Sequence, residues 1–455
     1  MASTYLTKTQ ESSANSQIFT YSTWVKRSGI TGAKQEMVSG GSASTDFDMF
    51  YFDASERLSY YSKTSNSENL DLATSRKFRD TSAWYHIVLS VDTTQGTASN
   101  RVKLYVNGVL ETAYDTSTYP SVNTNLFLNK ANQSQIIGRQ AYSAVDYFDG
   151  SMSHINFIDG TAYDATAFGE YDANGVWKIK TSPSVTYGTN GFFILKDGNS
   201  VTDQSGNGNN FTVGGGTLTN TEDSPSNVFN VLNAVSNPPN GYTLSNGNLE
   251  ATVSGQSFVR QFIANTIAPT SGKWYWESKL ITSGGSDRSR LGICSYEENI
   301  GTGTTVPQNE LSIATGSSRI RFTENGSTTE VDGFFTIPSA NDIFMYALDL
   351  DNTKFYFGIN GNWWNYNTAE TGGDPTSGSG YVTNSTNIIK GAMSLLINVQ
   401  AGAAATTFTN QFNFGNGYFG TTPVSSAGTN ASGNGIFEYD VPTGYTALST
   451  KGLNL

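Results

Sequence analysis

Few side chains in this sequence have the types and spacing that carboxylate catalysis requires. A retaining glycosidase needs two carboxyl groups about 5–5.5 Å apart, which alternate positions on one strand face can supply. Pairs with this spacing include Glu438 with Asp440 in "FEYD" and Asp349 with Asp351 in "LDLDN". Glu438 and Asp440 form an isolated carboxylate pair near the C-terminus, and we interpret them as solvated rather than catalytic.

The two histidines give no stronger sign of chemistry. His86 and His154 both lie in strand-like segments, and we predict hydrogen-bonded structural roles for them rather than general-base roles. A serine nucleophile needs a sharp G-x-S-x-G turn, and none occurs in a supporting context. The sequence also has no phosphate-binding loop and no zinc-ligand spacing. We therefore predict that the protein is not an enzyme.

The main alternative to catalysis is binding of a sugar on an aromatic platform. The best candidate for this platform is "NGNWWNYN" (360–367). Aromatic rings can stack on a sugar while amides pair with its hydroxyls. The candidate ligand-binding residues are Asn360, Asn362, Trp363, Trp364 and Tyr366. Because neighbouring strand residues point to opposite faces, one tryptophan is expected in the core and the other exposed. A platform and ordinary packing both remain open.

The elements that position these residues must be strands. The chain has 455 residues, which exceeds one comfortable core and favours two domains. Aromatic residues make up 13% and charged residues 14%, with 47 glycines and many Ser, Thr and Asn residues. This composition favours strands joined by Gly/Asn turns, and two hairpins carry Asn-Gly, at 107–108 and 360–361. We predict an all-β fold of two β-sandwich domains, and no repeat of a fibre shaft is present.

Charge and cysteine content narrow the partners. The net charge is −12 with no basic run, so we predict no nucleic-acid partner. Cys294 is the only cysteine, which excludes an intrachain disulfide, and we expect it to be buried. The N-terminal segment lacks the apolar region of a signal peptide, and no apolar run is long enough to span a membrane. We expect a protein made in a cytosol, with no membrane insertion.

Composition shifts along the chain predict its boundaries. We expect a polar N-terminal arm at 1–17, a first sandwich at 18–215, an Asn/Pro-rich linker at 216–241, and a second sandwich with a C-terminal tail at 242–455.

The first region resembles the laminin-G-like branch of the concanavalin-A-like jelly-roll sandwiches. The segments that carry this resemblance, in the order of that family, are "TYSTWVKR" (20–27), "WYHIVLSVD" (84–92), "VKLYVNG" (102–108), "IIGR" (136–139) and "FDGSMSHINFIDGTAY" (148–163). Glucanases of these folds place E-x-D-x-x-E on one strand, and this sequence has no such spacing. The loop "LKDGNSVTDQSGNGNNFT" (195–212) is similar to a loop of that family but follows the domain instead of starting it.

The laminin-G resemblance also implies calcium as a possible cofactor, because such relatives often hold this ion at the sandwich rim. The oxygen-bearing candidates are Asp197, Asp203, Asn207 and Asn209. The competing interpretation is a tight turn in which Asp203 caps backbone N–H groups.

The second region resembles a SPRY domain, also a two-sheet sandwich. "GKWYWESKL" (272–280), "RLGIC" (290–294) and "YALDLDNTKFYFGINGNWW" (346–364) carry the resemblance. It implies that Asp349 and Asp351 flank a turn and are structural. The two Asn-Gly hairpins are then convergent turn chemistry in unrelated sandwiches.

The pairing of these domains resembles virion proteins of tailed phages that infect marine bacteria. The supporting segments are 157–180, 203–212 and 223–233. This resemblance implies a bacteriophage structural protein on the exterior of the particle, as a tail fibre or receptor-binding component that recognises host-surface carbohydrate. The implied partners are other virion proteins, further copies of the chain in a homo-oligomer, and a host glycan. The alternative is a capsid or tail decoration protein with a purely structural role; a bacterial surface adhesin is a weaker third reading, because no signal peptide is seen.

Overall fold

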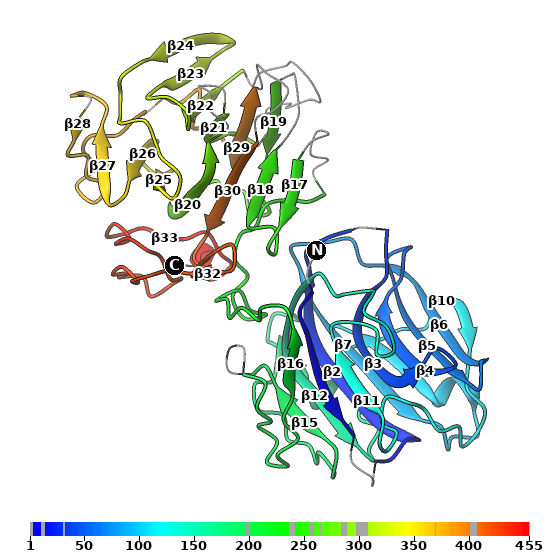
Figure 1. Ribbon diagram of the computed structural model, residues 1–455. Coiled ribbons are helices and arrows are strands. Elements are labelled where there is room, and N and C mark those ends of the chain that lie inside the picture. The colour runs from blue at the N-terminus through cyan, green and yellow to red at the C-terminus, as the bar shows by residue number, and fades with distance from the viewer. Residues whose placement is uncertain are drawn as a thin grey trace. The chain divides into compact units, whose positions relative to one another are not determined.

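The chain forms two separate units (Figure 1). The computed structural model describes residues 3–10, 14–30, 32–196, 198, 200–235, 242–253, 259–263, 265–283, 289–296, 308–368, 370–383, 385–400 and 407–454. The first unit is Met1–Asn220 and the second is Thr221–Leu455.

The first unit contains two large antiparallel sheets. The eight-stranded sheet has the order β10 (Tyr114–Thr118), β6 (Ser67–Lys77), β5 (Arg57–Thr64), β4 (Asp46–Phe52), β3 (Gln35–Ala43), β11 (Ser134–Ile137), β1 (Tyr5–Thr9) and β16 (Thr212–Gly215). The six-stranded sheet has the order β15 (Phe192–Ile194), β12 (Gly150–Asp159), β2 (Ile18–Arg27), β7 (Trp84–Asp92), β8 (Val102–Val106) and β9 (Val109–Leu110). A small hairpin adds β13 (Gly169–Tyr171) and β14 (Trp177–Ile179).

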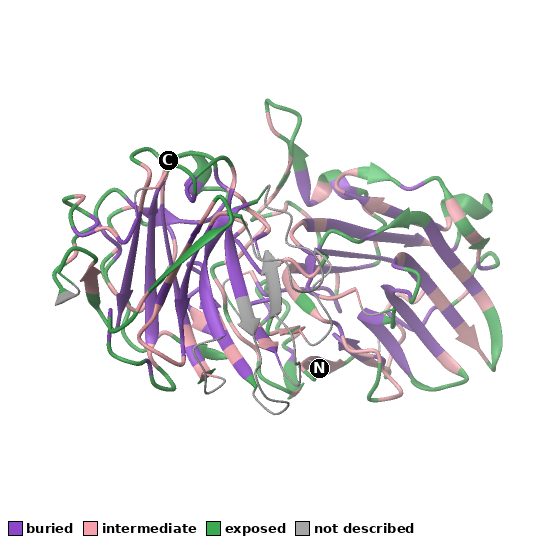
Figure 2. Ribbon diagram, turned by 90° about the horizontal axis from the view of Figure 1, so that it is seen from above, coloured by how far each residue is buried: buried purple, intermediate pink, exposed green. Residues whose placement is uncertain are grey.

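Alternation along the strands builds the core of this unit. Phe50 and Phe52 of the eight-stranded sheet share one apolar cluster with Ile87, Leu89 and Val91 of β7. Because side chains alternate across a strand, the residues between them on β7 face away from the core. The strands are accordingly buried along most of their length (Figure 2). Two sheets that share one core make a sandwich, which confirms the predicted fold class for this unit.

The N-terminal segment differs from the separate arm expected at 1–17. Tyr5–Thr9 is strand β1, which pairs with β11 on one side and β16 on the other. Leu6 lies opposite Ile137 and is only 3% exposed. The few apolar side chains of this polar segment gave no strand pattern, but burial of Leu6 and the backbone ladder hold the segment in the sheet.

The second unit also contains two large sheets. One has the order β17 (Tyr242–Ser245), β18 (Glu250–Val253), β30 (Phe408–Asn413), β20 (Lys273–Ser283), β25 (Ile343–Asp349), β26 (Lys354–Ile359), β27 (Asn362–Asn365) and β28 (Glu370–Thr371), and β33 (Thr446–Ala447) pairs with β20. The other has the order β19 (Val259–Ile263), β29 (Met393–Gln400), β21 (Ser289–Ser295), β22 (Glu310–Ala314), β23 (Ile320–Glu324) and β24 (Ser327–Val331). A short hairpin joins β31 (Tyr418–Phe419) and β32 (Thr422–Pro423).

The C-terminal tail packs on the second unit. Phe437, Val441 and Tyr445 form a cluster with Tyr275 of β20. Buried Glu277 fixes the tail, because its carboxylate accepts hydrogen bonds from the backbone N–H groups of Glu438 at 2.9 Å and Tyr439 at 2.8 Å. Burial raises the pKa of Glu277 to about 7.

The linker expected at 216–241 is largely part of this second unit. Phe229, Val231 and Leu232 are buried in its clusters. Phe229 also bridges to Ser449, and Leu232 bridges to Asn265. The Asn/Pro content of this stretch concealed a short apolar pattern, and burial of that pattern places the division of the units at Asn220 instead.

Helical structure is minimal in the described residues, which hold only the 3₁₀ turns η1 (Ala98–Asn100), η2 (Ala165–Ala167) and η3 (Gly452–Asn454). Asp164 caps η2, since its side chain accepts a hydrogen bond from Thr166 N. Within 164–179, this 3₁₀ turn is the helical structure that the described residues contain. No helix in the described part of the chain has the length and apolar character to cross a membrane.

Candidate functional site

A polar hollow opens on the six-stranded sheet of the first unit, over strands β7 and β8. Its volume is about 340 Å³. The residues that line it are Ser90, Asp92, Gln95, Asn100, Lys103, Tyr105, Ala162 and Asp164. None of them was among the predicted ligand-binding residues.

The pairing of β7 with β8 makes the floor of the hollow. Ser90 lies directly opposite Lys103, and Val88 lies opposite Tyr105. Leu89, which lies between Val88 and Ser90 on β7, is fully buried in the sandwich core. Alternation therefore turns the polar residues of both strands outward, on the face away from the core.

One wall is the turn between β7 and β8. Asp92 holds this turn, because its carboxylate accepts hydrogen bonds from Thr94 N at 3.1 Å and Gln95 Nε2 at 2.6 Å. Although burial raises it, these bonds hold the pKa of Asp92 below its usual range. Arg101 braces the same turn by donating to the carbonyl oxygens of Gln95 and Gly96, both at 2.8 Å.

The other wall is the segment that follows β12. Thr20 of β2 anchors it by donating to Thr161 O at 2.8 Å and accepting from Tyr163 N at 2.8 Å. Asp164 ends this wall and caps η2 through Oδ1, which accepts from Thr166 N at 2.8 Å. Burial and the charge of Asp164 raise the pKa of Tyr105.

Several polar groups of the hollow are not used by the protein itself. Within the described part of the chain, Lys103 Nζ forms no ion pair within 4.0 Å, and the side-chain amide of Asn100 forms no hydrogen bond. Asp164 uses Oδ1 for its cap, which leaves Oδ2 without a partner in the described residues. The hollow therefore offers a cation, an amide and a carboxylate oxygen to a ligand.

The predicted sugar platform of the second unit is used mainly for packing and turn formation. Asn360 has a φ of 50° in its Asn-Gly turn. Its Oδ1 accepts from Ile343 N at 2.9 Å, and its Nδ2 donates to Asp342 Oδ1 at 2.8 Å. The Asn362 amide donates to Asn360 O at 3.3 Å. The Asn360 side chain is therefore fully used by the turn, whereas the Asn362 side chain is held only weakly.

The two tryptophans of the platform pack on different clusters, and both are half-buried. Trp363 lies 6.2 Å from Tyr275 between ring centroids, whereas Trp364 lies 6.2 Å from Phe334. Tyr366, which is 37% exposed, lies 5.5 Å from the same Phe334. The expectation that one tryptophan is exposed is wrong, and of the aromatic platform residues Trp364 and Tyr366 pack on the same phenylalanine.

The loop predicted to offer calcium ligands is closed by its own hydrogen bonds. Asp203 Oδ1 accepts from Phe193 N and Ser205 N, both at 2.8 Å. Its Oδ2 accepts from Ser205 Oγ at 2.8 Å and Asn209 N at 2.9 Å. The prediction that Asp203 caps backbone N–H groups is confirmed.

The other predicted calcium ligands do not complete a site. Asn207 Nδ2 and Asn209 Nδ2 both donate to Gly191 O, at 2.9 and 2.8 Å. Asp197 lies outside the described residues. Among the described residues, no three His, Cys, Asp or Glu side chains are grouped to hold a metal. A calcium ion would have to displace the bonds that close the loop, so these residues do not fit a calcium site.

His86 lies beside a serine, but the pair is not arranged for nucleophilic catalysis. His86 Nε2 lies 2.9 Å from Ser22 Oγ, and His86 Nδ1 lies 3.0 Å from Trp177 Nε1. An indole N–H can only donate, so Nδ1 accepts and Nε2 carries the proton of the neutral ring. Burial lowers the pKa of His86 to about 3. The ring cannot accept a proton from Ser22, and the prediction of a structural histidine is confirmed.

The carboxylate pairs found in the sequence serve turns and segment ends. Asp349 lies 3.0 Å from Lys273 Nζ, and Asp351 accepts from Gly272 N at 2.8 Å. Glu438 accepts from Ser425 N at 2.7 Å, and Asp440 accepts from Thr429 N at 2.6 Å. All four make contacts that hold the backbone or an ion pair. The first pair flanks its turn as the SPRY resemblance implied, and the second accepts backbone hydrogen bonds while Asp440 stays exposed, as expected.

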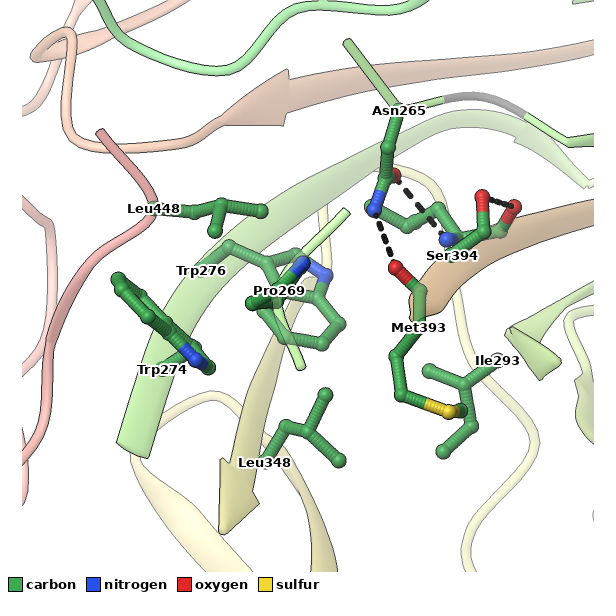
Figure 3. Close-up of a pocket in the computed structure, with 10 residues that line it drawn as sticks. Asn265, Pro269, Trp274, Trp276, Ile293, Leu348, Met393, Ser394 and Leu448 are labelled. Carbon is green, nitrogen blue, oxygen red and sulfur yellow. Dashed lines mark hydrogen bonds between the residues drawn. The ribbon is translucent and has the colours of Figure 1, made fainter. Parts of the chain in front are cut away.

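A second cavity lies in the core of the second unit (Figure 3). Its volume is about 10 Å³, which is close to the space of one water molecule. Trp276 reaches it, and the buried indole Nε1 of Trp276 has no hydrogen-bond partner among the residues that the structure describes. The cavity is too small for a sugar.

The hollow could be found only in part from the sequence. The alternation in "SVD" (90–92) and "KLY" (103–105) indicates outward polar residues on two strands. Nothing in the sequence brings Asp164 to the same place, because it belongs to a connection some sixty residues later, after several other strands.

The family comparison agrees with a lectin-like sandwich for the first unit. Residues 1–165 match the model of a laminin-G family of the concanavalin A-like lectin/glucanases superfamily. No curated protein sequence matches the chain. Among solved structures, the chain is similar to the SPRY domain of human HERC1, with 12% identity over 38% of this chain and 91% of that chain and a TM-score of 0.27. It is also similar to domains LG4-5 of the mouse laminin alpha1 chain, with 8% identity over 90% of this chain and 86% of that chain and a TM-score of 0.28.

Proposed function

We propose that this protein binds carbohydrate without hydrolysing it, and that the hollow over β7 and β8 is the binding site. The observation that carries this proposal is the 340 Å³ space with donors and acceptors that the chain leaves unused. Ligand sites start at about 300 Å³ and use a few placed polar groups. All residues that line the hollow lie within the part of the chain that matches the lectin/glucanase model.

The chemistry of the hollow supports binding over hydrolysis. A glycosidase needs a general acid whose pKa is raised. The hydrogen bonds to Asp92 lower its pKa instead, against the effect of burial. The buried Ser22–His86 pair cannot supply a nucleophile, because its imidazole nitrogen already carries a proton.

We further propose that the ligand is a host-surface glycan and that the protein lies on the exterior of a bacteriophage particle, as a tail fibre or other receptor-binding component. Support comes from the sequence resemblance at 157–180, 203–212 and 223–233. A single site of this kind binds a sugar weakly, and several copies on one particle would add avidity. The second sandwich remains a SPRY-like domain by resemblance.

Binding of the full-length protein to a panel of bacterial surface glycans, measured by calorimetry, tests the carbohydrate proposal. We expect Asn100→Ala to weaken binding at least about fivefold, because it removes a free amide from the hollow. Asn387→Ala is the matched control, since Asn387 is an exposed asparagine of the second unit. Absence of binding to any glycan would refute the proposal and favour the decoration protein.

The location is tested separately. Gold-labelled antibodies against the protein should mark intact particles in electron micrographs, and the free protein should compete with the particles for adsorption to host cells. If the antibodies label the particles but the free protein does not compete for adsorption, the result would favour the decoration protein with a purely structural role.

A further inference from the structure

We infer that the hollow takes an uncharged sugar and that Asp164 excludes sugars that carry a carboxylate. This inference rests on the proposed carbohydrate function and adds the class of ligand. It follows from which charges line the hollow and which of their atoms remain free.

The charge balance of the hollow is negative. Asp92 and Asp164 supply two carboxylates against the single ammonium of Lys103, which gives a net charge of −1 among the lining residues. The whole chain carries −12. Long-range and local fields therefore both oppose an anionic ligand.

The free atoms of the hollow match a hydroxyl group better than a carboxylate. Lys103 and Asn100 can donate, while Asp164 Oδ2 can only accept. A hydroxyl group both donates and accepts, so neighbouring hydroxyls of one sugar can serve both kinds of partner. A carboxylate only accepts, and it would leave Asp164 Oδ2 facing a like charge without a donor.

Asp164, rather than Asp92, is the determinant. Both oxygens of Asp92 are occupied by the turn, since Oδ1 accepts from Thr94 and Oδ2 accepts from Gln95. Asp164 keeps Oδ2 free in the described structure. Its charge also reaches the floor, where it contributes to the raised pKa of Tyr105 after burial.

The test compares each hexose that the wild-type protein binds with the uronic acid formed by oxidising C6 of that hexose. Calorimetry at low salt should show the methyl hexoside bound at least about tenfold more tightly than the methyl uronoside. Asp164→Asn should reduce this ratio to about twofold or less, because it removes the charge while asparagine keeps the capping oxygen. Higher salt should shrink the wild-type ratio.

Asp80→Asn is the matched control. Asp80 is exposed and caps Ser82 N at 2.8 Å as Asp164 caps Thr166 N, but it does not line the hollow. We expect this variant to keep the wild-type ratio, with both variants melting near the wild-type temperature. A wild-type protein that binds hexoside and uronoside equally, or an Asp164→Asn variant with an unchanged ratio, would overturn the inference and leave carbohydrate binding intact. Failure of the wild type to bind any sugar would overturn both.

Discussion

Two buried carboxylates of the first unit differ in the hydrogen bonds that they accept. Asp48 is buried, and its Oδ2 accepts from Tyr60 OH at 3.0 Å and Leu128 N at 2.9 Å. Burial raises its pKa to about 6. Glu36 is also fully buried, and in the described residues neither of its carboxylate oxygens has a partner at good hydrogen-bond geometry. Burial, with the charge of Asp146, raises the pKa of Glu36 well above its usual value.

The state of Glu36 predicts a pH dependence of stability. Folding requires this group to stay protonated above the unfolded pKa of about 4.5, so its contribution to stability is complete below that pH and is lost as pH rises toward the folded pKa. In that range the free energy of unfolding should fall by about 1.4 kcal/mol per pH unit from this group. Glu36→Gln should flatten the dependence and raise the melting temperature at pH 7. Urea titrations from pH 4 to 8 check this, with the exposed Glu170→Gln as control; equal slopes in wild type and Glu36→Gln would contradict it.

The paired tryptophans of β27 should both act on stability. Each is half-buried against a different cluster, so we expect Trp363→Ala and Trp364→Ala each to lower the free energy of unfolding by about 2–3 kcal/mol. Neither change should alter glycan affinity at the hollow. Chemical denaturation with parallel binding measurements checks both points, and the exposed Asn362→Ala serves as control. A tryptophan variant that keeps its stability but loses binding would restore the platform hypothesis.

At the scale of elements, strand β1 predicts that the N-terminal segment cannot be removed without cost. It closes the ladder between β11 and β16 and buries Leu6. Leu6→Ala should cost about 2–5 kcal/mol, and deletion of 2–10 should destabilise the whole sandwich. Thermal melting and limited proteolysis measure the effect, with the exposed Thr9→Ala as control. A deletion variant as stable as the full chain would show that the segment is an arm after all.

The loop closed by Asp203 predicts insensitivity to calcium. A ligand that binds only the folded state raises the melting temperature, so neither calcium nor a chelator should shift it by more than about 1 °C. Asp203→Ala leaves several donors without an acceptor and should lower the free energy of unfolding by about 2–4 kcal/mol. Asp172→Ala, in an exposed turn, should have a much smaller effect. A calcium-dependent rise in melting temperature that Asp203→Ala abolishes would refute this reading.

At the scale of the whole molecule, each unit has its own core of buried strands. We therefore expect fragments 1–220 and 221–455 to fold alone, each with one cooperative unfolding transition and a far-ultraviolet circular dichroism spectrum without helical minima. Fragments cut at 241, the end of the expected linker, should leave the second unit less stable, because Phe229 and Leu232 would be lost from its core. Equal stability of the two versions would contradict the boundary at Asn220.

The sequence alone determined the features that depend on neighbouring residues. Composition and alternation predicted an all-β chain, and Asn-Gly predicted two tight turns. In both turns the asparagine and the glycine have positive φ, at Asn107, Gly108, Asn360 and Gly361. Hydrogen bonding of His86 and capping by Asp203 were also predicted, since strand context and turn residues are local signals.

Tertiary structure alone decided which distant segments meet. Pairing of β1 with β11 and β16, burial of Leu232 in the second core and the placement of Asp164 and Lys103 around one hollow all join residues far apart in the chain. Local patterns cannot encode such pairings, because the gain comes from area buried and hydrogen bonds completed only when the sheets assemble. The hollow exists for that reason. For the same reason, the tryptophans that were expected to bind a ligand are used for packing, whereas the strand residues that line the hollow are left free to bind one.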